Sequence, residues 1–375
     1  MTTFTQEPHK LLVIPGPIEV TDEVLYANAH PSMSHMSADF VPVLGDCIRM
    51  TREVLFTTTG QPFIIAGSGT LGWDQVAANL VEAGESALVL NSGYFEVDEV
   101  YADLGTSVDL VEVEKALSSK KYKILTFTHV DTSTAVLSDA QAIAATVQRV
   151  SPDTLVVMDG VCSVASEEIR MDAWGIDIVL TASQKGLGTP PGLSILVASQ
   201  KAIKVFEARK TPPTSYYASW KKWLPVMQAY ERGSAAYFAT PPVNLVYAFR
   251  TSLTQITKGP QSLEERFALH RKGSQRLRDA VAELGLKQLP TSPAVAANGM
   301  TAIYLPDGYA ASDIVPRMLK RNVVVAGGLH KDVKDKYFRI GHMGVSVTDE
   351  SRGDIDKIIS ALRESFADAA ASKKA

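Results

Sequence analysis

The feature that most constrains the fold is a regular alternation, over residues 61–199, of short apolar runs with segments of helical periodicity. This alternation is typical of βαβ units, in which a mainly parallel sheet lies between layers of helices. A helix is expected to begin after Ser138, whose hydroxyl would cap the backbone amide of Gln141, and to end at Val150. We expect strands at residues 63–66, 87–90, 124–127, 155–158, 178–180 and 193–197. The chain is therefore predicted to be an α/β protein.

A different pattern begins near residue 259. Gly259 and Pro260 would end a helix expected over residues 243–256, and Ser262 with Glu265 has the spacing of a capping box. Beyond it we expect a helix to Leu284, strands at 301–305, 323–325 and 337–340, a helix from Ser312 and a last helix from about Thr348. A length of 375 residues exceeds the roughly 150 of one domain. We predict an N-terminal segment (1–20), a large domain (21–258) and a smaller α+β domain (259–375).

Composition narrows the possible partners. Apolar residues make up 46% and charged residues 21%, as in ordinary globular proteins. Because 37 basic residues against 41 acidic residues give a net charge of −4, no positive field favours nucleic acid or a membrane surface. The histidine spacings suggest no metal site, and no stretch is long and apolar enough to span a membrane. We expect a cytoplasmic protein that acts on small molecules.

The two cysteines, Cys47 and Cys162, cannot provide a disulfide framework for a chain of this length. This usage is consistent with a reducing compartment. Cys162 follows Asp159 by three residues, and we interpret it as a buried packing residue.

The segment Gly67–Gly72 matches the G-x-G-x-x-G pattern of dinucleotide-binding folds, since it follows an expected strand and precedes a helix. That pattern requires an acidic residue about 20 positions later to hold the ribose. Residues 91–93 read Asn-Ser-Gly and supply none, so a nicotinamide-dependent oxidoreductase is the weaker interpretation. A glycine-rich turn at a helix N-terminus can still bind one phosphate, although a plain tight turn remains the alternative.

Two further residues point to chemistry at the same edge of the sheet. Asp159 ends the expected strand 155–158, and Lys185 follows the strand 178–180. Alone, Asp159 could cap a turn and Lys185 could be a solvated surface charge. Because both follow parallel strands, the two side chains could lie in one crevice with the glycine-rich turn that can bind a phosphate. A shielded lysine amine forms Schiff bases with aldehydes, and a carboxylate can hold a ring nitrogen, so the combination suggests pyridoxal phosphate.

Several segments in order resemble class V, fold type I pyridoxal-phosphate-dependent aminotransferases, and in particular the alanine-glyoxylate and serine-pyruvate branch. These segments are Pro15-Gly16-Pro17, Gly67-Ser68-Gly69-Thr70, residues 128–134, Gln184-Lys185-Gly186 with Pro190-Pro191-Gly192, and Arg339-Ile340-Gly341-His342-Met343-Gly344. The likeness runs from about Leu12 to Met343. It implies a large domain with a mainly parallel sheet between helices and a smaller C-terminal domain.

The resemblance also implies roles around the cofactor. Lys185 would form the Schiff base with pyridoxal phosphate, and Asp159 would pair with the ring nitrogen. The residues that would hold the phosphate and the ring are Ser68, Gly69, Thr70, Phe95, Thr132 and Gln184. The branch often has His at the position of Thr70 and Trp at that of Phe95, so phosphate binding and ring stacking would differ here.

The same resemblance implies which residues bind the substrate and which reach a second subunit. Arg339 would clamp the amino-acid carboxylate through its planar guanidinium, with the main chain at Gly16 beside it. Tyr237 and Thr240 would reach the phosphate of a neighbouring subunit, which implies a homodimer with shared active sites.

The activity that follows is transfer of the amino group of L-alanine to glyoxylate, giving pyruvate and glycine, by a ping-pong mechanism. Serine-pyruvate or serine-glyoxylate transamination is the alternative, because pockets that differ by one hydroxyl discriminate weakly unless a buried partner binds it. A nucleotide-dependent oxidoreductase and a non-catalytic binding protein are the alternatives from other classes.

Overall fold

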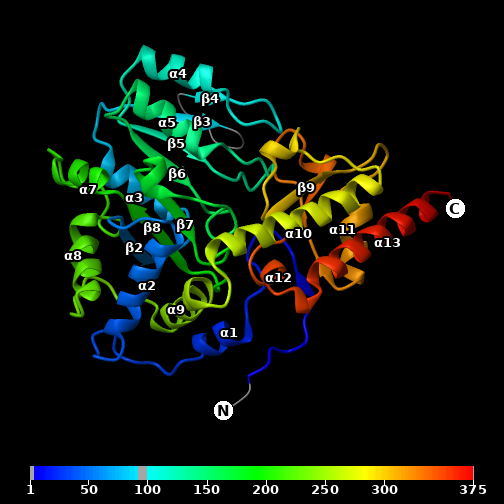
Figure 1. Cartoon of the computed structure of the whole chain (residues 1–375), viewed down its shortest axis with the longest axis horizontal. Helices are drawn as coiled ribbons and strands as arrows, with labels where there is room; N and C mark the ends of the chain where they lie inside the picture. The colour runs from blue at the N-terminus through cyan, green and yellow to red at the C-terminus, as the bar shows by residue number, and fades with distance from the viewer. Residues whose placement is uncertain (1–3, 92–98, 375) are drawn as a thin grey trace.

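The computed structural model describes residues 4–91 and 99–374 (Figure 1). Its larger part is built on one mixed sheet, in which the order of described strands is β2-β8-β7-β6-β5-β3-β4. Neighbouring strands run parallel except for β8, which is antiparallel to both β2 and β7. The predicted, mainly parallel sheet is confirmed. The strands are β2 (Gln61–Ala66), β3 (Ala87–Asn91), β4 (Glu99–Tyr101), β5 (Ile124–Thr128), β6 (Leu155–Asp159), β7 (Ile178–Ala182) and β8 (Leu193–Ala198).

Helices cover this sheet. Helices α2 and α8 pack against β2, α3 packs against β7 and β8, and α5 packs against β6. The helices of this part are α1 (Asp22–Asn28), α2 (Val41–Val54), α3 (Leu71–Leu80), α4 (Leu110–Ser119), α5 (Ala140–Val150), α6 (Met171–Trp174), α7 (Gln200–Glu207), α8 (Trp220–Glu231) and α9 (Val243–Lys258). No helix of the described residues combines the length and apolar character needed to cross a membrane.

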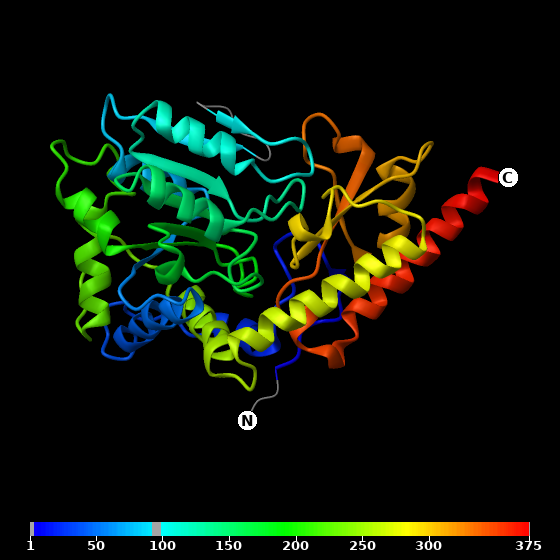
Figure 2. The same ribbon diagram turned by 45° about the horizontal axis from the view of Figure 1, so that its top comes forward.

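The smaller part contains the antiparallel sheet β11-β12-β9. Its long helix α10 begins at the predicted capping box of Ser262 and Glu265, and α13 lies beside it (Figures 1 and 2). The short strand β1 (Leu11–Leu12) pairs in parallel with β10, so the N-terminal residues join this part. Its elements are α10 (Leu263–Glu283), β9 (Met300–Tyr304), α11 (Ala311–Lys320), β10 (Val323–Val324), β11 (Ala326–Gly327), β12 (Tyr337–Gly341), α12 (Val345–Thr348) and α13 (Asp354–Lys374).

Two helix starts differ from the prediction. The cap of α5 is Asp139, whose carboxylate accepts the amide of Ala142, because the Ser138 hydroxyl donates instead to the carbonyl oxygen of Thr128. The last helix begins at Asp354 and not near Thr348, where the separate short helix α12 ends. Gly353, with φ of 65°, lies between the two in a left-handed conformation that breaks helical continuity.

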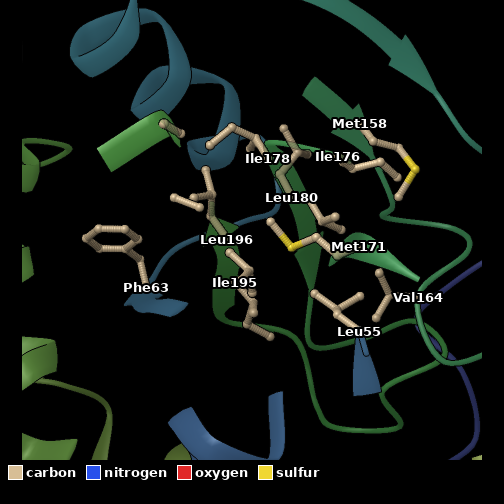
Figure 3. Packing of buried hydrophobic residues seen from close by; sticks show 14 of the residues in the cluster. Leu55, Phe63, Met158, Val164, Met171, Ile176, Ile178, Leu180, Ile195 and Leu196 are labelled. Atoms are coloured by element: carbon tan, nitrogen blue, oxygen red, sulfur yellow. The ribbon is translucent and has the colours of Figure 1, made fainter. Parts of the chain in front are cut away.

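The core holds the central strands rigidly. Ile178 and Leu180 of β7 pack with Ile195 and Leu196 of β8, and Met158 of β6 lies on the neighbouring strand (Figure 3). All five side chains are completely buried, and burial of each stabilises the fold by about 1.5–3 kcal/mol. The carboxyl ends of β6 and β7 are therefore fixed supports for the residues that follow them.

Candidate active site

The strand directions bring the sequence-predicted residues to one edge of the sheet. Because β8 is antiparallel to both β2 and β7, strands β2, β5, β6 and β7 all run in the same direction. Their carboxyl ends therefore share an edge, which is where open α/β sheets bind ligands. Asp159 is the last residue of β6, Lys185 follows β7, Thr132 follows β5 and the turn at Gly69 follows β2.

Lys185 is buried, with 8% of its surface exposed. Its Nζ donates a hydrogen bond to the carbonyl oxygen of Pro15 and lies 3.4 Å from the Sγ of Cys162. The backbone of Gly16 lies against the lysine stem, since a Cβ on Gly16 would be 2.3 Å from Lys185 Cδ. The structure thus places Gly16 beside Lys185, and its expected position beside the substrate carboxylate stays a prediction.

Asp159 has an unusual titration for a carboxylic acid. Loss of solvation raises the pKa of its carboxyl to about 6, against the lowering effect of hydrogen bonds from the Val161 amide and the Trp73 side chain. The Val161 amide donates to Oδ1 at 2.8 Å. A carboxylate with this much desolvation gains from a cationic partner, which is what a protonated ring nitrogen provides.

The turn after β5 positions Thr132. The Asp131 carboxylate accepts the backbone amides of Ser133 and Thr134, each at 2.8 Å, and so fixes this turn. Thr132 then places its Oγ1 at 2.9 Å from Cys162 Sγ. Its side chain therefore contacts the sulfur that also contacts Lys185.

Arg339 reaches the same turn from the smaller part of the molecule. It lies on β12 with 9% of its surface exposed. Its Nε donates to the carbonyl oxygen of Gly327 at 2.8 Å, and its Nη1 donates to that of Thr132 at 2.9 Å. Nη2 has no hydrogen-bond partner among the described residues, and although burial lowers the pKa of Arg339, the guanidinium stays charged. It can therefore bind a carboxylate at that end.

The start of α3 lies where we expected a phosphate to bind. A Cβ on Gly69 would lie 3.1 Å from the side chains of both Ala182 and Val161, so only glycine fits without displacing them. Ser68 and Thr70 are exposed at this turn, and the Thr70 side chain makes no capping hydrogen bond. Their hydroxyls and the first helix amides can serve a phosphate.

Two buried polar atoms near these strand ends are unpaired. Gln184 Oε1, next to Lys185, and His129 Nδ1, one residue after β5, have no hydrogen-bond partner in the part of the chain that the structure describes. Burial lowers the pKa of His129 to about 4, so its imidazole is neutral at physiological pH. Orphaned buried polar atoms are costly, and a bound polar molecule would relieve that cost.

Within the described residues, two predicted positions do not join this cluster. Tyr237 and Thr240 are exposed between α8 and α9, and no contact among the described residues links them to Lys185 or Asp159. Phe95, expected to stack on the ring, lies outside the described residues.

The sequence interpretation missed the position of Cys162. It is buried as expected, but its sulfur contacts both Lys185 and Thr132. The available signal was its place three residues after Asp159, where the first turn beyond the strand can direct a side chain back to the same edge. The carbonyl of Pro15 was also missed, because no side chain marks a backbone acceptor.

The family follows from a comparison over most of the chain. A family model described as aminotransferase class V matches residues 23–344. The chain belongs to this family. It is accordingly a pyridoxal-phosphate-dependent transaminase, with an amino acid and a 2-oxo acid as substrates. This membership supersedes the oxidoreductase and non-catalytic alternatives, and Asp159, the start of α3 and the two orphaned polar atoms fit the cofactor.

Relatives of known name cover nearly the full length. The chain is 38% identical to alanine–glyoxylate aminotransferase 1 of Saccharomyces cerevisiae, over 91% of this chain and 93% of the relative. It is 30% identical to serine–glyoxylate aminotransferase of Arabidopsis thaliana, over 89% and 85%. A solved structure of alanine–glyoxylate aminotransferase from Nostoc matches with a TM-score of 0.88 and 26% identity, over 98% and 97%.

Proposed function

We propose that this aminotransferase moves the amino group of L-alanine to glyoxylate, giving pyruvate and glycine. The names of the yeast and Nostoc relatives support this assignment. The observation that carries it in the structure is the chain of contacts by which Cys162 and Thr132 connect the Lys185 amine to the Arg339 guanidinium. The serine–glyoxylate relative supports serine as the alternative donor, with the same acceptor.

The cofactor would be held through its ring and its phosphate. Pyridoxal phosphate, when bound, supplies an aldehyde that takes up the amino group and a ring that withdraws electrons. In our proposal the Asp159 carboxylate pairs with the ring nitrogen. The residues that would hold the ring and the phosphate are Ser68, Gly69, Thr70, Phe95, Thr132 and Gln184.

Lys185 would have two tasks. Its amine would form the covalent link to the cofactor, and once freed it would move the proton at the substrate Cα. Burial supports this role, because it keeps water away from the amine and restricts the positions that the amine can reach.

Arg339 would bind the substrate carboxylate. The bonds to Gly327 and Thr132 fix the guanidinium plane and leave Nη2 to the substrate. Gly16, against the lysine stem, would form the neighbouring wall. Holding the carboxylate this way sets the direction of the Cα–H bond relative to the Lys185 amine.

We also propose a cytoplasmic homodimer in which Tyr237 and Thr240 complete the phosphate site of the neighbouring subunit. Exposed aromatic rings near them support an interface. The ring centroids of Tyr216 and Tyr217 lie 5.4 and 6.5 Å, respectively, from that of Phe238. Tyr237 itself keeps 64% of its surface exposed. A cluster of exposed aromatic residues is typical of a protein interface. Free cysteines at positions 47 and 162 are consistent with the reducing cytoplasm.

The donor is tested by measuring kcat/KM for alanine, serine and aspartate with saturating glyoxylate, with glycine and the 2-oxo acid quantified by mass spectrometry. We expect alanine to exceed serine by about tenfold or more. A higher value for serine would replace alanine by the alternative donor, and a higher value for aspartate would contradict both assignments.

A further inference from the structure

The Lys185 amine contacts two hydrogen-bond acceptors. The carbonyl oxygen of Pro15 accepts one of its hydrogen bonds, and the sulfur of Cys162 lies 3.4 Å from Nζ, within hydrogen-bonding range for sulfur. Pro15 belongs to the N-terminal segment and Cys162 follows β6, so the amine is fixed from two sides.

Cys162 is held in place on its other side. Its sulfur lies 2.9 Å from Thr132 Oγ1, and its side chain, with 1% exposed, belongs to the same buried cluster as Val130, Ala135 and Tyr337. A thiol can accept and donate at once. It can therefore accept from the lysine amine while its own S–H donates to the threonine hydroxyl.

We propose that Cys162 is a positioning residue of the transamination reaction, which holds the Lys185 amine near the cofactor whenever that amine is not bonded to it. This inference rests on the proposed function of Lys185. A freed amine on a flexible four-carbon stem can adopt many positions, and only those close to the substrate Cα transfer the proton. The sulfur limits those positions without competing for the proton, because it is a weak acceptor.

Other charged groups lie around this contact. Asp159 at the end of β6 interacts electrostatically with Lys185, and Asp131 in the turn after β5 interacts with both Asp159 and Arg339 on β12. All three stay unchanged in the variants below, so a difference between variants at position 162 reports on the sulfur contact.

The test compares C162S, which keeps an acceptor, with C162A and C162V, which do not; valine also restores most of the lost volume. In the full chain freed of cofactor, the rate of acetylation of Lys185 by acetic anhydride is followed by mass spectrometry relative to the exposed lysines of the same chain. Removal of the sulfur contact leaves the amine less restrained, so we expect this rate to rise about 3- to 10-fold in C162A and C162V and to stay near wild type in C162S.

In the holoenzyme we expect kcat to fall about 3- to 10-fold in C162A and C162V with KM for alanine nearly constant, and C162S to stay within about twofold of wild type. An unchanged acetylation rate of Lys185 in both C162A and C162V, whatever their Tm, overturns the proposal, as does a C162S variant that behaves like C162A. Failure of the function of Lys185 itself would be seen separately, as cofactor attached at another lysine of the wild-type enzyme.

Discussion

Gly16 and Lys185 are in direct contact through the main chain of one and the stem of the other. A Cβ on Gly16 would lie 2.3 Å from Cδ and 2.9 Å from Nζ of the lysine. The same segment is tied to β12, because the amide of Gly341 donates to the carbonyl oxygen of Val13 at 2.8 Å. The N-terminal segment therefore connects the strand that carries Arg339 to the lysine.

Replacing Gly16 by alanine should displace the lysine. We expect Gly16→Ala to lower kcat by about 100-fold, because small shifts of a reacting group have effects of this size. The φ of +112° adds backbone strain of about 1–3 kcal/mol. Steady-state kinetics and urea unfolding measure the two effects. Gly84→Ala is the matched control, since Gly84 has a φ of +86° and open space around it; it should lose stability but keep its activity. Normal kcat in Gly16→Ala would remove this glycine from the site.

The guanidinium of Arg339 is expected to bind every amino donor. Arg339→Lys should raise KM for alanine, serine and aspartate alike by about 10- to 100-fold, since an ammonium cannot reproduce the planar arrangement of donors. The control is Arg149→Lys. The exposed side chain of Arg149, on α5, pairs with Glu114 on α4, in the larger part of the molecule. Unchanged KM values in Arg339→Lys would exclude the carboxylate clamp.

The Asp159 carboxyl should make stability depend on pH in the cofactor-free chain. Its pKa is raised from 3.8 to about 6, so its favourable contribution is complete below about pH 4 and is lost as the pH rises through about 6. Asparagine at this position does not ionise, so Asp159→Asn removes the cost of a buried negative charge at higher pH. Relative to wild type, the variant should gain roughly 1–3 kcal/mol in free energy of unfolding between pH 4.5 and pH 8.

Urea unfolding of the cofactor-free chain at the two pH values measures this gain. Asp153→Asn, in the exposed turn before β6, is the control and should behave the same at both. With cofactor, Asp159→Asn should lower kcat by about two to three orders of magnitude. An equal stability difference at pH 4.5 and pH 8 would mean that Asp159 titrates normally.

Shared active sites can be tested by subunit complementation. A Lys185→Ala subunit and a subunit with Tyr237→Ala and Thr240→Ala should each be inactive or nearly so as a homodimer. Coexpressed, they should recover about a quarter of wild-type activity, because half of the dimers are mixed and each mixed dimer contains one intact site. No recovery from two inactive homodimers would place Tyr237 and Thr240 in the site of their own subunit, and an active homodimer of the double variant would place them outside it.

Much of the fold and part of the site could be predicted because periodicity and strand ends are local features. The strand before Asp159 and the strand before Lys185 are continuous apolar runs, and both are present in the structure. The antiparallel direction of β8 could not be predicted, because the sequence of a fully buried strand does not show whether it runs parallel or antiparallel to its neighbours. The cap at Asp139 was missed because Ser138 found a tertiary acceptor. The division of the chain near residue 258 stays a prediction.

Contacts between distant segments were the least predictable part of the site. Pro15 and Lys185 are 170 residues apart, and Thr132 and Arg339 are 207 apart. Their meeting depends on how the N-terminal segment and β12 lie against the sheet edge. The contacts of Cys162 could not be predicted from its residue type either, because a buried cysteine is most often a small apolar packing residue.

The central claim is that Lys185 carries the cofactor. Reduction of the holoenzyme with borohydride, followed by proteolysis and mass spectrometry, locates the pyridoxyl group on the chain. We predict a single labelled peptide that contains residues 184–186 with the modification on Lys185. A label on any other lysine, or a holoenzyme that borohydride does not label, would contradict the account.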